Sequence, residues 1–284
     1  MGYRQSKTIQ TVNRHLLLIA ISLLFLLPII WMISTSLKSR DGVFVYPPQF
    51  FSFPLVWQNY PAALQFIDFW RYFFNTVVIS LFNVLGTLVS CPIVAYGFSR
   101  MRWRLREPLF YLCLSTIMLP FLAVMVPTYV LFKSLNWIGN PNILWGWAPL
   151  IVPAFGGSPL YIFLLRQFFL NIPSELSEAA MIDGANEFQI FSRIIFPLAK
   201  PAVTTVCIFT FVGTWTDFLA PRIFITQKTQ YTLSLGLLDY FSVHQTEWTY
   251  LMAACVVFVL PVVILFFFAQ RLFVEGISLT GIKG

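Results

Sequence analysis

Charged residues are scarce in this chain, and its long apolar stretches contain almost none. Only 10% of its 284 residues are charged, whereas 58% are hydrophobic. A soluble domain averages about 25% charged and about 45–50% apolar residues. The shortage of charge therefore excludes an ordinary soluble core and predicts an all-α polytopic membrane protein.

The sequence also lacks the usual signatures of catalysis and metal binding. It has no Gly-x4-Gly-Lys-Ser/Thr loop for a nucleotide, and the Gly-Lys dipeptide does not occur. Its two histidines fall at or beyond the ends of apolar stretches, and its four cysteines stand singly inside them. No C-x2-C spacing exists, so neither a disulfide framework nor a metal site is indicated. We expect a non-catalytic chain that binds no cofactor of its own.

Six apolar stretches are long enough to cross a bilayer. They cover residues 16–36, 72–97, 108–132, 144–165, 202–225 and 250–273. The first is too long for a signal peptide and lacks a small-x-small cleavage site, so we expect it to be retained. The longest connections, residues 37–71 and 167–201, are too short for a soluble domain. Residues 1–284 are therefore expected to form a single transmembrane domain.

Basic residues in short loops predict the orientation, because they gather on the cytoplasmic side. A cytoplasmic N-terminus places most of them inside: Arg4, Lys7, Arg14, Arg100, Arg102, Arg104, Arg106, Arg166, Arg193, Lys200, Arg271 and Lys283. The outer side keeps Lys38, Arg40, Arg71, Lys133, Arg222 and Lys228. Both termini and the loop 167–201 are thus expected in the cytoplasm. The net charge of +7 follows from this topology and indicates no nucleic-acid partner.

Helix breakers interrupt the third and fourth apolar stretches. Pro120 and Pro127 lie in the third, and Pro149, Pro153, Gly156, Gly157 and Pro159 lie in or near the fourth. In lipid, the freed backbone groups must be satisfied by neighbouring protein or by a water-filled path. The breaks are therefore expected either to line a path or to be packing kinks.

The central parts of the six stretches are nearly free of ionisable residues, although ion-coupled carriers usually need them. Asp217 is the exception, near the outer end of the fifth stretch, with Arg222 five residues on. Asp217 either faces a solute path as a hydrogen-bonding group or is an interfacial carboxylate paired with a base. One carboxylate gives little support for proton coupling.

The inner loop 167–201 has an ordered helical pattern. Ser174 is a candidate N-cap for a helix over 174–182 that contains two small helix formers, Ala179 and Ala180. Small side chains there would allow another surface to approach closely. The pair Asp183-Gly184 then predicts a turn.

A second helix is predicted over 187–196, with Asn186 as its cap. Phe188, Phe191, Ile194, Ile195 and Leu198 recur near helical spacing and predict its apolar face. Pro197 and Pro201 are expected to end it and redirect the chain. An amphipathic loop lying on lipid would explain the second helix but not the small-residue helix and turn before it.

These residues resemble the EAA loop of ABC-importer permease subunits. The pattern E-A-A-x3-G-x9-I-x-L-P is matched by Glu178, Ala179, Ala180, Gly184, Ile194 and Pro197, with Phe196 in place of its Leu. The resemblance extends to the maltose-type sugar permeases through residues 165–169, 172–176, 183–185 and 215–219, with Thr216 where Asn is usual. The closing stretch 274–284 is similar to the tail of the shorter, six-span subunit of that subfamily.

The resemblance implies a transmembrane subunit that is driven by other proteins. It implies a second permease subunit, two cytoplasmic ATPases that bind ATP-Mg, an extracytoplasmic solute-binding protein, and a bacterial or archaeal cytoplasmic membrane. The implied ATPase-coupling residues are Glu178, Ala179, Ala180, Asp183, Gly184, Ile194 and Pro197. The implied ATPase-contacting tail residues are Gly276, Gly281 and Lys283.

The solute path and the solute are less constrained by the sequence. The candidate path residues are Trp215, Asp217, Phe218, Gly156 and Gly157. The resemblance implies a sugar or related glycoside, although aromatic residues occur throughout and do not select one solute. A stand-alone channel or secondary carrier and a structural membrane scaffold are the alternative functions.

Overall fold

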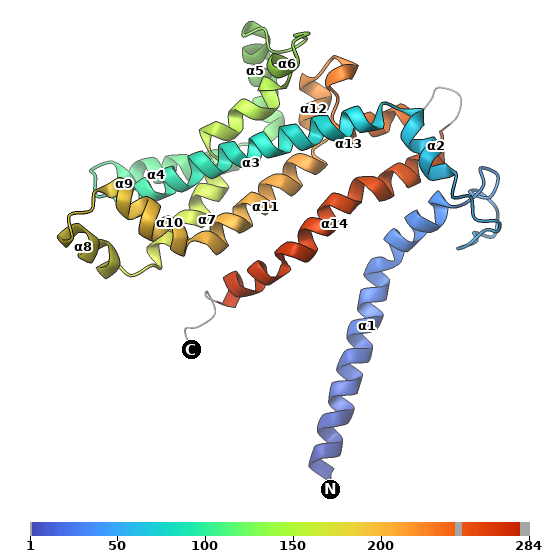
Figure 1. Ribbon diagram of the computed structural model, residues 1–284, viewed down its shortest axis with the longest axis horizontal. Helices are drawn as coiled ribbons and strands as arrows, with labels where there is room; N and C mark the ends of the chain where they lie inside the picture. Colours follow the sequence, from blue (N-terminus) through green and yellow to red (C-terminus); the bar gives the residue numbers. More distant parts are fainter. Residues whose placement is uncertain (1, 242–245, 279–284) are drawn as a thin grey trace. The chain divides into compact units, whose positions relative to one another are not determined.

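The regular elements of the chain are helices throughout the part that the structure describes (Figure 1). The computed structural model describes the backbone of residues 2–241 and 246–278, and the side chains of residues 10–241 and 246–270. Within these ranges the β-type pairing is a single isolated bridge between Phe241 and Thr246. The expected all-α class is confirmed.

The described helices give four candidate membrane spans, or six if each of two sharply bent helix pairs counts as one span. Four pass alone by length and composition: Gln10–Ser36 within α1 (Gly2–Ser36), α3 (Phe69–Ser99), Ile143–Leu170, and Trp248–Gln270 within α14 (Trp248–Ser278). Two more qualify as bent pairs, Arg106–Met118 with Phe121–Ser134 at 99° and Glu187–Leu198 with Lys200–Thr216 at 77°. The prediction of a polytopic membrane protein with broken spans is therefore confirmed.

The chain packs as two compact units. The first comprises Met1–Phe69 and Leu237–Pro261, and the second comprises Trp70–Gly236 and Val262–Gly284. The first unit holds α1, α2 (Asn59–Phe66), η5 (Leu237–Tyr240) and the first part of α14. Within it the Tyr240 hydroxyl donates to the Ala63 carbonyl at 2.9 Å, which ties η5 to α2. The second unit holds the candidate site residues named above.

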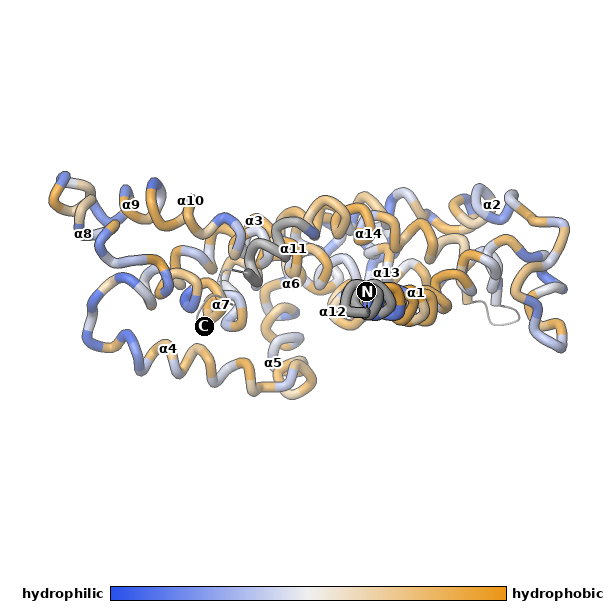
Figure 2. The backbone as a smooth tube through the Cα atoms, turned by 90° about the horizontal axis from the view of Figure 1, so that it is seen from below, coloured by the Kyte–Doolittle hydropathy of each residue, from blue (hydrophilic) through white to orange (hydrophobic). Residues whose placement is uncertain are grey.

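In the second unit, α3 contacts two groups of segments. The connection from α3 to α4 (Arg106–Ser115) and the segment from α8 (Glu175–Ile182) to α10 (Phe196–Leu198) lie at its C-terminal end (Figures 1 and 2). The ends of α5 (Phe121–Ser134), α6 (Ile143–Ile151) and α12 (Leu219–Phe224) gather beside the first half of α3, where Ile79 packs with Trp147 and Ile225. There Asn75 donates to the Thr229 and Tyr231 carbonyls at 3.0 and 2.9 Å, and Gln230 donates to the Asn140 carbonyl at 2.8 Å. Loops that the basic residues assign to the same side of the membrane thus lie near one another in this unit.

The break in the fourth span is packed against α3. The span consists of α6, the 3-10 turn η2 (Val152–Gly156) and α7 (Pro159–Leu170). Asn83 donates to the Leu150 carbonyl at 3.0 Å, and Ser90 donates to the Ala154 carbonyl at 3.1 Å. A Cβ atom on Gly86 would lie 2.8 Å from the Phe155 ring, so the backbones approach closely here. Packing against α3 satisfies these freed carbonyls and is sufficient to explain the break.

The prediction of one continuous apolar stretch over 202–225 is wrong at its outer end. α11 (Lys200–Thr216) stops before Asp217, whose backbone is extended, and α12 begins two residues later. The Asp217 carboxylate accepts a hydrogen bond from the Ala220 N–H at 3.3 Å. A carboxylate that bonds to nearby backbone competes with helix continuation and favours a new helix start, which hydropathy alone does not register.

Candidate functional site

The predicted small-residue helix is present as α8 (Glu175–Ile182). Its N-cap residue is Ser174, as predicted, but the Ser174 side chain does not cap the helix. The Ser174 backbone is already helical, and no side-chain cap bond forms. Its carbonyl instead accepts from the Ser177 and Glu178 N–H groups at 2.9 and 3.0 Å. Glu175 and Glu178 in the first turn interact favourably with the positive end of the helix.

The turn after α8 is a complete Schellman motif, as the pair Asp183-Gly184 suggests. Gly184 has φ +83°, in the left-handed region that favours glycine. Its N–H donates to the Met181 carbonyl at 3.1 Å, and the Ala185 N–H donates to the Ala180 carbonyl at 2.9 Å. These two bonds are the ones that define the motif, so the chain direction after α8 is set by backbone geometry.

The second predicted helix is split into α9 (Glu187–Ile190), a π-turn (Phe191–Ile195) and α10 (Phe196–Leu198). Capping by Asn186 is confirmed and takes the reciprocal form. The Asn186 side chain accepts from the Gln189 N–H at 2.9 Å, and the Gln189 side chain accepts from the Asn186 N–H at 2.9 Å. This capping box fixes where the second helix begins.

The π-turn changes which apolar residues face inward. Ile190 and Ile195, five residues apart, are both buried, whereas Phe188 is 74% exposed and Leu198 is 48% exposed. The predicted face, which includes Phe188 and Leu198, is therefore partly wrong. A π-turn widens the helix so that residues i and i+5 align, and a pattern read at 3.6 residues per turn misses this shift.

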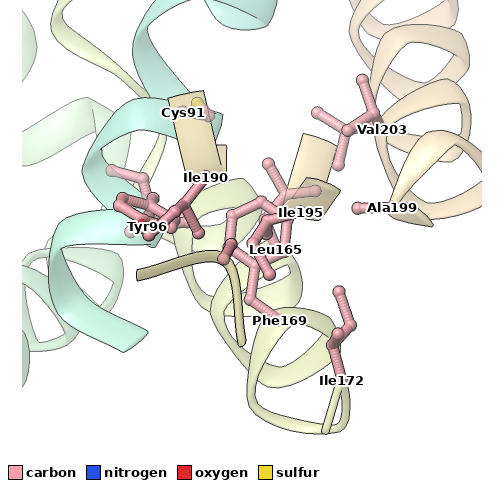
Figure 3. Close-up of a cluster of buried hydrophobic side chains, with 13 residues drawn as sticks. Cys91, Tyr96, Leu165, Phe169, Ile172, Ile190, Ile195, Ala199 and Val203 are labelled. Carbon is pink, nitrogen blue, oxygen red and sulfur yellow. The ribbon is translucent and has the colours of Figure 1, made fainter. Parts of the chain in front are cut away.

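A buried cluster anchors the α8–α10 segment to three spans (Figure 3). Ile190 and Ile195 converge there with Tyr96 of α3, Phe169 of α7 and Val203 of α11. Close-packed interiors transmit displacement because they have few voids in which to absorb it. A force applied to the segment would therefore pass directly to the helices beneath it.

The two alanines of α8 face opposite ways. Ala180 is 9% exposed and belongs to the buried cluster, whereas Ala179 and Glu178 are exposed. The small side chain at Ala180 thus lets α8 lie close to its own bundle, whereas Ala179 is exposed. Ile182, at 87% exposed, and Phe188, at 74%, are exposed as well. We call Glu178, Ala179, Ile182 and Phe188 the outer face of the segment.

The remaining implied coupling residues lie around this surface. Asp183 is exposed and forms the C-cap of α8, while Ile194 and Pro197 are half-buried at the junction with α11. Of the implied tail residues, Gly276 lies in the last turns of α14, and Gly281 and Lys283 lie outside the described residues.

Polar contacts also fix the segment and the α7 end, and sequence reasoning missed them. The Tyr96 hydroxyl donates to Glu187 at 2.5 Å, linking α3 to the start of α9. Arg100 donates to the Phe169 carbonyl at 2.5 Å and also to the Ile172 carbonyl. In the sequence, Arg100 counts only among the basic residues that predict orientation. No local pattern predicts a contact between Tyr96 and Glu187, because the two residues are far apart in the chain.

Arg166 forms a second link, between α7 and α4 (Arg106–Ser115). It donates to both Glu107 carboxylate oxygens at 2.9 and 3.0 Å and to the Phe98 carbonyl at 3.0 Å. Its guanidinium also lies 4.0 Å from the Phe110 ring centroid. This arginine therefore ties the helix that leads into α8 to two neighbouring helices.

Of the candidate path residues, the structure brings Asp217 alone to a cavity of about 260 Å³ whose lining is mainly apolar. Its polar lining residues are Asn83, Thr128, Thr214, Asp217 and Thr232, and its apolar lining includes the rings of Phe121, Phe132 and Phe224. The described part of the chain shows no ion pair between Asp217 and Arg222. The paired-base alternative is therefore not observed.

The other candidate path residues lie elsewhere. Trp215 is fully buried, with its ring 5.5 Å from those of Phe73 and Phe211. Phe218 is 41% exposed, Gly156 is exposed, and Gly157 packs near Ile162 with φ +81°. None of these four lines the cavity around Asp217.

Comparison with known proteins gives concordant matches. Residues 83–279 match the model of the family described as "Binding-protein-dependent transport system inner membrane component". The chain is 34% identical to the probable ABC transporter permease protein YurM of Bacillus subtilis, over 90% of this chain and 83% of that protein. It is 32% identical to the arabinooligosaccharides transport system permease protein AraQ of the same organism, over 93% of this chain and 92% of that protein.

A solved structure shares the fold. A chain of a bacterial ABC transporter involved in the import of the acidic polysaccharide alginate superposes with a TM-score of 0.80. The match covers 95% of this chain and 99% of the solved chain, with 24% sequence identity.

Proposed function

Since the chain belongs to the family of binding-protein-dependent transport system inner membrane components, we propose that it is one of two permease subunits of an oligosaccharide importer. Membership makes it a non-catalytic, multi-pass component of an ABC transporter that works with an ATPase and a binding protein. The second permease subunit, the pair of ATPases that bind ATP-Mg and the solute class are parts of the proposal.

The observation that carries the coupling role is the outer face of the α8–α10 segment. It exposes Ile182 and Phe188 on a segment whose other side is packed into α3, α7 and α11. Exposed apolar side chains on such a segment call for a partner surface. An ATPase groove that accepts Glu178 and Ala179 would apply its force to a segment already fixed to three spans.

Topology supports the same role. The α3–α4 connection, with its arginines, shares one end of the second unit with α8, and basic loops favour the cytoplasm. We therefore place α8 and both termini on the cytoplasmic side. The tail residues Gly276, Gly281 and Lys283 would reach the same ATPases.

A second permease subunit is supported by α1. Residues 10–30 of this helix are exposed throughout, and they include Leu16, Leu24 and Phe25. Apolar residues of a span need lipid or another helix around them. Such a helix can pack against a companion subunit, with which this chain would enclose the path.

The sugar class rests on the relative AraQ and on the chemistry of the cavity around Asp217. Hydroxyl-rich solutes need hydrogen-bonding groups beside apolar rings, and this cavity offers Asn83, Thr128 and Asp217 beside Phe121 and Phe224. We propose that Asp217 accepts a hydrogen bond from the solute during passage.

Replacing Asp217 by Asn tests this role. Asn retains the ability to start α12 but carries no charge. A hydrogen bond to a charged group contributes about 1.5–3 kcal/mol and one to the neutral Asn oxygen about 0.5–1.5 kcal/mol, so the half-saturating solute concentration should rise roughly five- to tenfold. The measurement is ATP-driven uptake by the assembled transporter in proteoliposomes.

The companion variant Asp217→Ala separates binding from helix capping. If capping alone matters, Asp217→Asn transports normally and Asp217→Ala loses about 1 kcal/mol of stability. Unaltered uptake kinetics in Asp217→Asn would therefore remove Asp217 from the path.

The proposed function as a whole is tested by reconstitution. Uptake should require the companion permease, the ATPases, ATP and the binding protein together. Solute flux through the purified chain alone, without ATP, would instead identify a stand-alone channel or carrier. Copurification without any ATPase would favour a scaffold.

A further inference from the structure

A basic groove opens beside the α8–α10 segment, at the end of α3. One cavity of about 600 Å³ is lined by Ser99, Arg100, Arg102, Arg106, Asn171 and Ser174, together with neighbouring backbone and Glu175. A second cavity, of about 520 Å³, shares Arg100, Arg102 and Ser174 with it. We call the first cavity the arginine groove. Its lining holds three arginines and one carboxylate, so it favours an anion.

Two polar atoms at this place have no partner within the described part of the chain. They are Arg100 Nε and the Ser177 hydroxyl, which line the second cavity and are buried as atoms. Burying a donor without a hydrogen bond is unfavourable. Burial also lowers the pKa of the Arg100 guanidinium from its ordinary value. An anion in the groove close to Arg100 would stabilise the charged form of this guanidinium.

The arginines of the groove differ in how far they are already engaged. Arg106 pairs with Glu107 at 2.9 Å, and Arg100 is bonded to two backbone carbonyls through Nη2. Arg102 is exposed and forms no hydrogen bond or ion pair with any described residue. Arg102 is therefore the cation that is free to meet an incoming ligand.

We propose that the arginine groove binds the phosphate of an anionic phospholipid headgroup, with Arg102 as its principal contact. Arg100 directly follows the last residue of α3, so the groove lies where a span leaves the bilayer. Met101, Trp103 and Leu105 alternate with the arginines and are 41–55% exposed. Exposed apolar and aromatic side chains beside arginines are typical of the membrane interface.

The acidic residues nearby limit where the phosphate lies. Glu178 and Glu187 line the second cavity, and Glu187 already accepts the Tyr96 hydroxyl. Glu175 is the carboxylate in the arginine groove. The headgroup is therefore placed at the Arg102 and Arg106 side of the groove, away from Glu178.

The test compares Arg102→Gln with Arg104→Gln in the assembled transporter. Arg104 is exposed on the same turn but does not line the groove, so it is the matched control. Native mass spectrometry in mixed micelles gives the affinity for phosphatidylglycerol against phosphatidylcholine. One arginine near a membrane surface contributes about 1 kcal/mol, so Arg102→Gln should weaken phosphatidylglycerol binding about fivefold, and Arg104→Gln less than about twofold.

Further arms identify the source of the phosphate and the competing occupant. Inorganic phosphate should not displace the lipid at equal concentration, because it lacks the acyl chains held by the bilayer. Equal losses in both variants, equal affinity for inorganic phosphate, or no preference for phosphatidylglycerol would each overturn the proposal. If the permease subunits bound the lipid without the ATPases but the assembled transporter did not, the proposal would also be overturned, because an acidic protein side chain would then fill the groove. Melting temperatures of the two variants should match that of the unchanged complex, since both arginines are exposed.

Discussion

Replacing Gly184 by Pro should reduce ATP-driven uptake at least about tenfold. Gly184 has φ +83°, whereas proline is fixed near −65°, and its N–H, which proline lacks, bonds to the Met181 carbonyl. The local cost is on the order of 3 kcal/mol, which exceeds the roughly 1.4 kcal/mol that corresponds to tenfold. The chain would then leave α8 in a different direction. The outer face of the segment would meet the ATPase in the wrong orientation.

The matched variant is Gly184→Asn. Nothing lies within 4 Å of a Cβ atom at this position, so the strain on any substitution comes from the backbone alone. Asn tolerates the left-handed region better than other side chains and retains the N–H. Gly184→Asn should therefore keep most of the uptake. The assay is ATP-driven uptake in proteoliposomes, with complex yield checked for each variant. Normal uptake by a fully assembled Gly184→Pro complex would show that the geometry of this turn is irrelevant to transport.

Replacing Arg166 by Met should lower the stability of the assembled transporter more than any surface change. The Arg166 side chain is 10% exposed and is bonded to Glu107 and to the Phe98 carbonyl. Removing one partner of a buried pair costs about 3–5 kcal/mol, and the exposure of Glu107, at 42%, reduces this to about 2–3 kcal/mol. Met retains the apolar contact with Phe110, so the loss reports the polar bonds.

The control for Arg166 is Arg193→Met, because Arg193 is exposed on the π-turn. The melting temperature of the purified complex should fall clearly for Arg166→Met and little for Arg193→Met. In a double-mutant cycle with Glu107→Gln, the two losses should be non-additive. Additive losses would mean that Arg166 acts through its backbone bond and ring contact rather than through Glu107.

Sequence reasoning recovered the parts of the fold that depend on composition and on local backbone chemistry. Long apolar stretches located the four candidate spans that qualify as single helices, because a bilayer imposes their length. The turn at Gly184 and the cap at Asn186 followed from the special geometry that each residue permits. The end of the fifth span was missed because Asp217 starts a new helix inside an apolar stretch.

The candidate site was predicted less completely, because side-chain direction depends on tertiary packing. Adjacent alanines look equivalent in the sequence, yet Ala180 is buried and Ala179 is exposed. The π-turn lets Ile190 and Ile195, five residues apart, both be buried, which a fixed helical period does not anticipate. The link between Arg166 and Glu107 joins residues far apart in sequence, which no local pattern indicates.

The most direct test of the account is a cross-linking comparison of Ala179→Cys and Ala180→Cys in the assembled transporter. A short thiol-directed photo-cross-linker is attached, and the unsubstituted complex gives the background from the four native cysteines. Because Ala179 faces outward and Ala180 faces the chain's own core, we predict an adduct with the ATPase from position 179 only. An Ala179→Cys transporter that is labelled but yields no ATPase adduct would contradict the proposal that α8 is where the ATPase takes hold.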